Sequence, residues 1–233
     1  MSRTSFKTAA ESTVTRRKFA VLFLFLLTFL IVYPYAQNSG LPYIGFRIFG
    51  IVITVLSVYA VSFRRSFVLF GLVLAIPAIV QHILLIRANE GALSVLSIVL
   101  SFVFDVYIVV VIFRRVFIKN EPTKEAIFGA LCIYLLLGYS FTGLYEMLAT
   151  VQPHAFYLDP AANFHSVPDR FDLIYYSFAN LTCVGANGIT PTSDPARSVS
   201  IIESVLGVLY LAVLISRLLS LYNTRGGALA HSK

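Results

Sequence analysis

The sequence predicts an all-α integral membrane protein with six membrane-spanning helices and a short re-entrant helix between the fifth and sixth spans. Three observations predict this fold. Hydrophobic residues make up 58% of the 233-residue chain and charged residues only 12%, whereas soluble domains carry about 25% charged residues. The hydrophobic residues gather in long runs, and apolar runs of about 18 residues or more indicate membrane spans. One further apolar run, residues 171–182, is too short to cross a bilayer.

The six spans are predicted to be helices because a lone strand cannot satisfy its backbone hydrogen bonds in lipid. Short polar breaks separate them, and the arginine pairs Arg64-Arg65 and Arg114-Arg115 close the second and fourth spans. We expect the first span to be retained, because it lacks the small-residue cleavage site of a signal peptide. The predicted spans cover residues 19–36, 46–62, 67–86, 91–113, 126–150 and 197–222.

The distribution of basic residues predicts the orientation of the chain. With the N-terminus inside, the cytoplasmic side holds all 18 lysines and arginines except Arg47, Arg87, Arg170 and Arg197. Such a bias places both termini in the cytoplasm, so the re-entrant loop opens outward. The predicted segments are an N-terminal cytoplasmic segment (1–18), a peripheral four-helix unit (19–118), a linker (119–125), a domain with the re-entrant loop (126–222) and a cytoplasmic tail (223–233).

Several classes of function are disfavoured by the same sequence. The net charge of +7 comes from basic residues at the ends of apolar segments, where they set topology and do not indicate nucleic-acid binding. The two cysteines, Cys132 and Cys183, have no spacing typical of a metal site or a disulfide framework. No catalytic triad, metal-ligand set or phosphate loop is visible, so we do not expect an enzyme. The absence of an internal repeat disfavours a small-solute transporter.

Residues 172–222 resemble the pore module of the tetrameric potassium-channel superfamily. The matching letters are YYSF in the short helix, ITP after the loop, and ARS…E…G…LYLA…RL along the last span. The resemblance extends to about residue 126, because the fifth span is similar to the outer pore helix, whereas the first four spans match only in number. It implies a homotetrameric cation channel surrounded by lipid, without a cofactor, of the type found in prokaryotic plasma membranes.

The resemblance places the selectivity filter at residues 182–188, here named the filter segment. The family reads Thr-Val-Gly-Tyr-Gly-Asp where this chain has CVGANG, residues 183–188. Such a filter replaces the water around a cation with rings of backbone carbonyls. The resemblance therefore implies that monovalent cations, and no other metal, bind at the carbonyls of Thr182, Cys183, Val184, Gly185, Ala186, Asn187 and Gly188.

The altered letters predict a looser filter. Inward-facing carbonyls need backbone angles that glycine adopts most readily; Gly185 keeps the first such position, and Asn187 can take the second, since asparagine tolerates positive φ. The thiol of Cys183 is a poor ligand for a hard cation, although a small residue filling space behind the backbone is the simpler interpretation. Ala186 removes an aromatic ring, and Gly188 removes an acidic group from the outer mouth.

Three residues outside the filter segment are expected to support it, and a fourth, Gly207, is a possible hinge. Tyr175 and Tyr176 belong to the short helix, and Glu203 lies within the last span, where it could brace the filter or simply tie two helices together. Gly207 could be a hinge of that span, but close helix packing is the simpler interpretation. The predicted function is passive cation transport with relaxed potassium selectivity. The alternative is a channel-like scaffold or accessory subunit that does not conduct.

Overall fold

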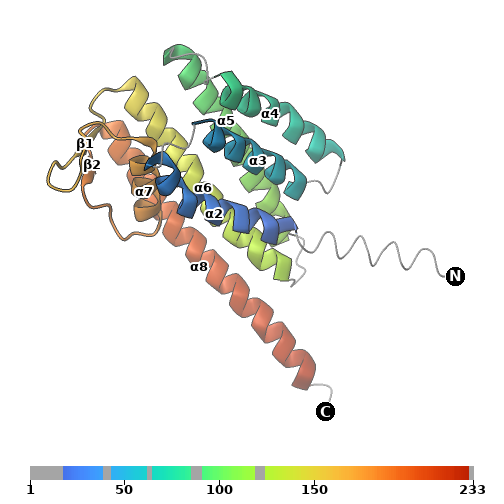
Figure 1. The fold of residues 1–233 in the computed structure, drawn as a ribbon. Helices are drawn as coiled ribbons and strands as arrows, with labels where there is room; N and C mark the ends of the chain where they lie inside the picture. The colour runs from blue at the N-terminus through green and yellow to red at the C-terminus, as the bar shows by residue number, and fades with distance from the viewer. Residues whose placement is uncertain (1–17, 39–42, 62–64, 85–90, 119–123, 231–233) are drawn as a thin grey trace. The chain divides into compact units, whose positions relative to one another are not determined.

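The chain divides into two compact units, Met1–Pro153 and His154–Lys233. In the computed structural model, shown in Figure 1, the described residues are 18–38, 43–61, 65–84, 91–118 and 124–230. The predicted N-terminal segment (1–18) and linker (119–125) therefore lie almost entirely outside the described residues. The division falls between the predicted outer pore helix and the re-entrant loop, and the assignment of both to one pore domain stays a prediction.

The first unit is a bundle of apolar helices whose bounds agree closely with the first five predicted spans. Neighbouring helices contact in a closed ring, in which each helix packs on the next along the chain and the last packs on the first. A stripe of apolar side chains from each helix fills the interior, and Leu22, Ile108 and Ile133 are completely or almost completely buried. The helices are α2 (Lys18–Asn38), α3 (Tyr43–Val61), α4 (Arg65–Leu84), α5 (Gly91–Phe113) and α6 (Lys124–Val151).

Polar contacts join the first and last helices of this bundle. The backbone N–H of Phe19 donates to Oε2 of Glu125 at 3.2 Å, which satisfies one of the N–H groups that a helix start leaves unpaired. The Tyr139 hydroxyl donates to the Leu26 carbonyl at 2.9 Å. These directional bonds set the position of α2 along the axis of α6, which apolar packing alone would specify less strictly.

Helix α5 ends at Phe113, where the fourth span was predicted to end, but the helical backbone does not stop at the arginine pair. After α5, the chain continues as a π-helix, η1 (Arg114–Ile118). A π-helix uses i→i+5 hydrogen bonds, and such turns are rare and usually short. The apolar Val116 of η1 is buried, at 4% exposure, so its packing gives a physical reason for the helix to continue past the basic residues.

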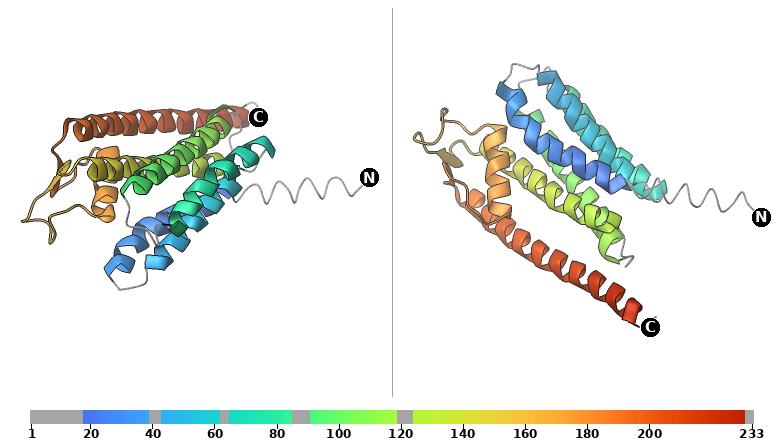
Figure 2. Two further views of the ribbon diagram at one scale, coloured as in Figure 1. Left: turned by 90° about the horizontal axis from the view of Figure 1, so that it is seen from above. Right: turned by 60° about the horizontal axis from the view of Figure 1, so that its bottom comes forward.

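The second unit contains a short helix, a long helix and two short strands. Helix α7 (Arg170–Leu181) is the predicted re-entrant helix, and α8 (Asp194–Ala230) contains the predicted sixth span. The two helices pack against each other, as the views in Figure 2 also show. The 12 residues of α7 give a length of about 18 Å, well short of a hydrocarbon core of about 30 Å. Helix α8 continues through most of the predicted tail, residues 223–233.

The strands were not expected from the sequence. β1 (Phe156–Leu158) and β2 (Ile189–Pro191) pair in antiparallel register, with Tyr157 opposite Thr190. The pairing connects the segment before α7 to the segment after the filter segment. It therefore fixes the point at which the chain leaves the filter segment for α8.

Three described helices are long and apolar enough to cross a membrane, over the windows Lys18–Tyr35, Glu125–Val151 and Asp194–Arg217. They belong to the predicted first, fifth and sixth spans. Two shorter apolar stretches, Gly50–Val61 and Phe67–Ile79, lie in the second and third. The described chain is thus largely helical with the apolar character of a membrane protein, and the count of six spans stays a prediction.

Candidate functional site

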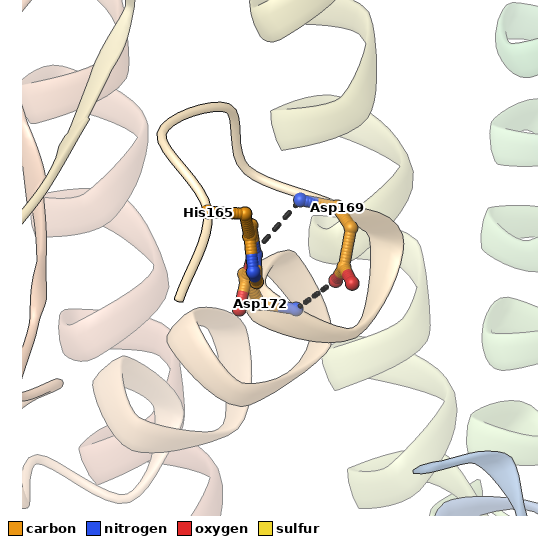
Figure 3. A group of neighbouring side chains, drawn as sticks. All are labelled: His165, Asp169 and Asp172. Atoms are coloured by element: carbon orange, nitrogen blue, oxygen red, sulfur yellow. Dashed lines mark hydrogen bonds and ion pairs between the residues drawn. The ribbon is translucent and has the colours of Figure 1, made fainter. Parts of the chain in front are cut away.

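The start of α7 is fixed by a reciprocal pair of hydrogen bonds. Oδ1 of Asp169 accepts from the backbone N–H of Asp172 at 2.9 Å, and Oδ2 of Asp172 accepts from the backbone N–H of Asp169 at 2.8 Å. The partial positive charge at the N-terminal end of the helix also stabilises both carboxylates. Figure 3 shows these two residues with His165, whose Nε2 lies 2.6 Å from Oδ2 of Asp172. The capping box defines where the short helix begins.

His165 is paired with this cap although it lies on the surface. The hydrogen bond with Asp172 raises the pKa of His165 above its ordinary value, slight burial opposes that shift, and the charges of Asp172 and Asp169 add to it. The ligand atoms of the three residues lie within 4.8 Å of one another, a spacing that a metal ion could bridge. Because Oδ2 of Asp172 already joins His165 to the helix cap, capping and charge pairing account for the cluster.

The end of α7 leads directly into the filter segment. The carbonyl of Ala179 accepts from the N–H groups of both Val184 and Gly185, at 3.0 and 3.2 Å, and the carbonyl of Asn180 accepts from Cys183 at 2.9 Å. These bonds turn the chain back immediately after the last helical residue. The filter segment therefore begins at the C-terminal end of α7, where the partial negative charge of the helix dipole favours a cation.

The backbone of the filter segment enters the left-handed region at three positions, Cys183, Gly185 and Gly188, with φ of 57°, 84° and 84°. Asn187 is not among the residues with positive φ, so the prediction that it takes the second special position is wrong. Gly188 takes that conformation instead, and without a Cβ it does so at little steric cost. The same conformation costs about 1–2 kcal/mol at a residue such as Cys183.

Tyr175 of α7 supports the filter segment through its hydroxyl, which accepts a hydrogen bond of 3.2 Å from the backbone N–H of Asn187. The sequence predicts Tyr175 as a support of the filter segment, in which alanine stands at position 186 in place of the family's aromatic ring. The contact that the structure gives Tyr175 is polar and reaches the residue after Ala186. This bond restrains Asn187 at a distance of twelve residues along the chain.

Tyr176 makes its contacts away from the filter segment. Its hydroxyl lies 2.6 Å from Oγ of Ser200, and Ser200 donates its own proton to the Ala196 carbonyl at 2.7 Å, so Tyr176 is the donor. Its ring packs edge to face on Phe156 of β1, with 5.4 Å between the centroids. Tyr176 therefore joins α7 to both α8 and the strand pair.

Glu203 of α8 is completely buried and accepts a hydrogen bond of 2.5 Å from the Ser177 hydroxyl of α7. A carboxyl group in such a place is costly unless it is hydrogen-bonded. The contact shows that Glu203 ties the two helices together, one of the two roles considered for it. Because Ser177 lies on the helix that ends at the filter segment, the tie also fixes that helix in place.

Gly207 allows α8 to approach the end of α7 very closely. A Cβ at this position would lie 2.1 Å from the carbonyl oxygen of Leu181, the last residue of α7. Backbone atoms cannot yield as a flexible side chain can. The structure therefore gives Gly207 a packing role against the residue that precedes the filter segment, and nothing in this contact calls for a hinge.

Cys183 also has a partner on α8, because its thiol lies 3.8 Å from the Ser204 carbonyl, within the range for a sulfur hydrogen bond. The side chain is nevertheless exposed, whereas Cys132 is buried. The contact agrees with the simpler interpretation of Cys183 as a small residue placed against the helix behind it.

The carbonyls of the filter segment fall into two groups. Among the described residues, none donates a hydrogen bond to the backbone carbonyls of residues 182–187. The carbonyl of Gly188, by contrast, accepts from the N–H of Asp159 at 2.9 Å and from Nδ2 of Asn163 at 2.7 Å. An ion at the Gly188 carbonyl would compete with these two hydrogen bonds, and the ion-binding role of the filter segment stays a prediction.

Residues 147–223 match the model of a family described as an ion channel. The matched region contains α7, the filter segment and most of α8. No curated protein and no solved structure matches the chain. The family match supports an ion-channel function of the pore-loop kind and a chain embedded in a membrane. It agrees with the resemblance found in the last third of the sequence.

Proposed function

We propose that the protein is a homotetrameric cation channel that passes potassium with relaxed selectivity over sodium, by passive transport. The observation that carries this proposal is the arrangement of α7 and the filter segment. A capped short helix ends at an exposed segment whose backbone carbonyls at residues 182–187 have no hydrogen-bond donor among the described residues. Such carbonyls are the ligands that replace water around a permeant cation.

The tetramer follows from the chemistry of cation binding. One filter segment supplies a single carbonyl at each level, whereas a dehydrated cation needs a ring of them. Four copies around a common axis would supply such rings. The apolar surface of α8 agrees with this proposal, because Ile201, Val205 and Leu209 are more than half exposed in the isolated chain. In the assembly, this surface would face lipid or neighbouring copies. The proposed channel lies in a prokaryotic plasma membrane, with both termini in the cytoplasm.

Relaxed selectivity is proposed from three features of the filter segment. Cys183 offers no hydroxyl to the innermost ion site, and a thiol binds hard cations poorly. Ala186 carries no ring for lateral packing. Gly188 uses its carbonyl in hydrogen bonds to Asp159 and Asn163. With fewer ion sites in series, the free-energy difference between potassium and sodium is expected to be smaller than in the intact family motif.

Single-channel recording of the purified protein in a planar bilayer tests the proposal. Discrete cation currents are expected, whereas a complete absence of current would favour the non-conducting scaffold. The matched variant Cys183→Thr, Ala186→Tyr and Asn187→Gly restores the first five letters of the family motif and leaves Gly188 in its left-handed conformation. It should raise the preference for potassium. Detergent-corrected mass measurement should give four chains, and a stable monomer or dimer in both detergent and lipid would contradict the proposed pore.

A further inference from the structure

The segment before α7 contains a tight turn at residues 159–163 that builds its own structure. The Asp159 carbonyl accepts from the N–H groups of Ala162 and Asn163, both at 3.0 Å. Oδ1 of Asp159 accepts from the N–H of Ala161 at 2.9 Å, an arrangement typical of aspartate at the start of a turn. The turn directly follows β1, so the strand pair fixes its position next to β2.

This turn holds the outer end of the filter segment. The Asn163 side-chain amide spans two carbonyls, because Nδ2 donates to Gly188 at 2.7 Å and to Asp159 at 3.0 Å. The N–H of Asp159 donates to the same Gly188 oxygen at 2.9 Å. The contact is close as well as polar, since a Cβ on Gly188 would lie 2.9 Å from Cβ of Ala162 and 3.0 Å from Nδ2 of Asn163.

Asn187 and Gly188 are thus restrained from two independent elements. On one side the Tyr175 hydroxyl of α7 accepts from the N–H of Asn187. On the other, the Asn163 amide donates to the carbonyl of Gly188. Between them lies the Asn187–Gly188 peptide bond, whose carbonyl ends the row of carbonyls without a donor among the described residues. The two bonds hold the peptide units on either side of this bond, so they limit its position and rotation from both ends.

We propose that Asn163 is a positioning residue for ion selectivity, which acts by fixing the outer end of the filter segment together with Tyr175. The inference rests on the proposed channel function and deepens it. In the family motif, an aromatic ring and an acidic residue occupy positions 186 and 188, and here alanine and glycine stand there. Ala186 and Gly188 cannot restrain the filter segment as those two side chains would. The turn at 159–163 supplies a restraint from outside the filter segment instead. Asn163 touches no ion and acts through the Gly188 carbonyl.

Replacing the side-chain amide tests this role. Asn163→Ala removes both donated bonds, and Asn163→Asp keeps the shape of the side chain but presents only oxygen to two carbonyl oxygens. Each variant should lower the potassium-to-sodium permeability ratio about three- to fivefold, the factor that one lost hydrogen bond represents. Phe164→Ala is the matched control, because this neighbouring side chain is fully exposed and its removal should leave the ratio unchanged.

A second measurement separates positioning from mere stabilisation of the turn. Tyr175→Phe removes only the hydroxyl that holds Asn187, and it should lower the same ratio. Because the two bonds flank the same Asn187–Gly188 peptide bond, the double variant Asn163→Ala/Tyr175→Phe should show less than the product of the two single effects. Conducting variants with the wild-type ratio, even with lowered thermal stability, would overturn the inference while leaving the channel proposal intact. Absence of current from the wild-type protein would overturn both.

Discussion

The Ser177 hydroxyl of α7 donates a hydrogen bond of 2.5 Å to the carboxyl group of Glu203 in α8, and both side chains are completely buried. The bond lies between the helix that carries the filter segment and the helix packed behind it. Its loss leaves a buried acceptor without one of its donors, and such losses cost about 1–3 kcal/mol. This pair is therefore a structural support of the candidate filter.

Ser177→Ala is expected to lower the free energy of unfolding by about 1–3 kcal/mol for that reason. Glu203→Gln should cost less than Glu203→Ala, because the amide oxygen can still accept from Ser177. Thermal unfolding in detergent, followed by circular dichroism, measures the effect. Ser198→Ala, at an exposed position of α8, is the matched control, and equal stability of the Ser177 and Ser198 variants would show that the buried bond contributes nothing.

Gly207→Ala is expected to disrupt the contact between α7 and α8. The added Cβ would lie 2.1 Å from the Leu181 carbonyl oxygen, and overpacking of this kind costs about 1–3 kcal/mol or more. Gly71→Ala in α4 is the control, because a Cβ there would meet its nearest neighbour, Tyr107, at an ordinary 3.6 Å. Size-exclusion chromatography and thermal unfolding should show a defect only for Gly207→Ala. A stable variant with altered opening kinetics would instead indicate a hinge.

The stability of the loop before α7 should depend on the protonation of His165. Asp172 raises the pKa of His165 above its ordinary value of 6.5. His165 therefore holds its proton more tightly in the folded chain than in the unfolded chain. This contribution is complete below the unfolded pKa and is lost as the pH rises through the folded pKa.

Thermal unfolding of the wild type and of His165→Gln measures that contribution. The difference in melting temperature should be largest at a pH below 6.5, the ordinary pKa of His165, and smaller at a pH well above that value. A histidine NMR titration provides the control, because Asp172→Asn should return the pKa of His165 towards its ordinary value. A difference in melting temperature that is the same at both pH values would show that the ion pair does not contribute.

The two cysteines should differ in reactivity with a thiol-directed reagent. Cys183 is exposed and Cys132 is buried, so labelling of the folded protein should occur at Cys183 and survive the change Cys132→Ser. Cys183→Ser should abolish it, as mass spectrometry can measure. If the filter segment lines the ion path, the same reagent should reduce the current. Labelling of Cys132 ahead of Cys183, or unchanged current after labelling of Cys183, would contradict this placement of the filter segment.

The helices could be predicted from sequence because long apolar runs and basic boundaries are local signals. Helix α5 ends at Phe113 as expected, and α7 differs from the predicted 171–182 by one residue at each end. The π-helix at Arg114–Ile118 gave no such signal, because it depends on the burial of Val116 against neighbouring helices.

The filter segment was placed from its flanking letters, but its conformation was not predictable from them. Asparagine tolerates positive φ, yet at Asn187 the Tyr175 hydroxyl holds the backbone N–H, and Gly188 takes the left-handed conformation. The β1–β2 pair and the Asn163 contact join residues that are far apart in the sequence. Strands of three residues and single amide contacts carry no periodic pattern, so only the folded chain reveals them.

The reversal potential of the reconstituted protein, with potassium on one side of the bilayer and sodium on the other, tests the central proposal most directly. A cation pore with a shortened row of carbonyl rings should carry both ions. The sign and size of the reversal potential should then indicate a modest preference for potassium. Exclusion of sodium as strict as in the intact family motif would contradict the proposed loss of ion sites. A reversal potential set by anions would contradict the cation channel itself.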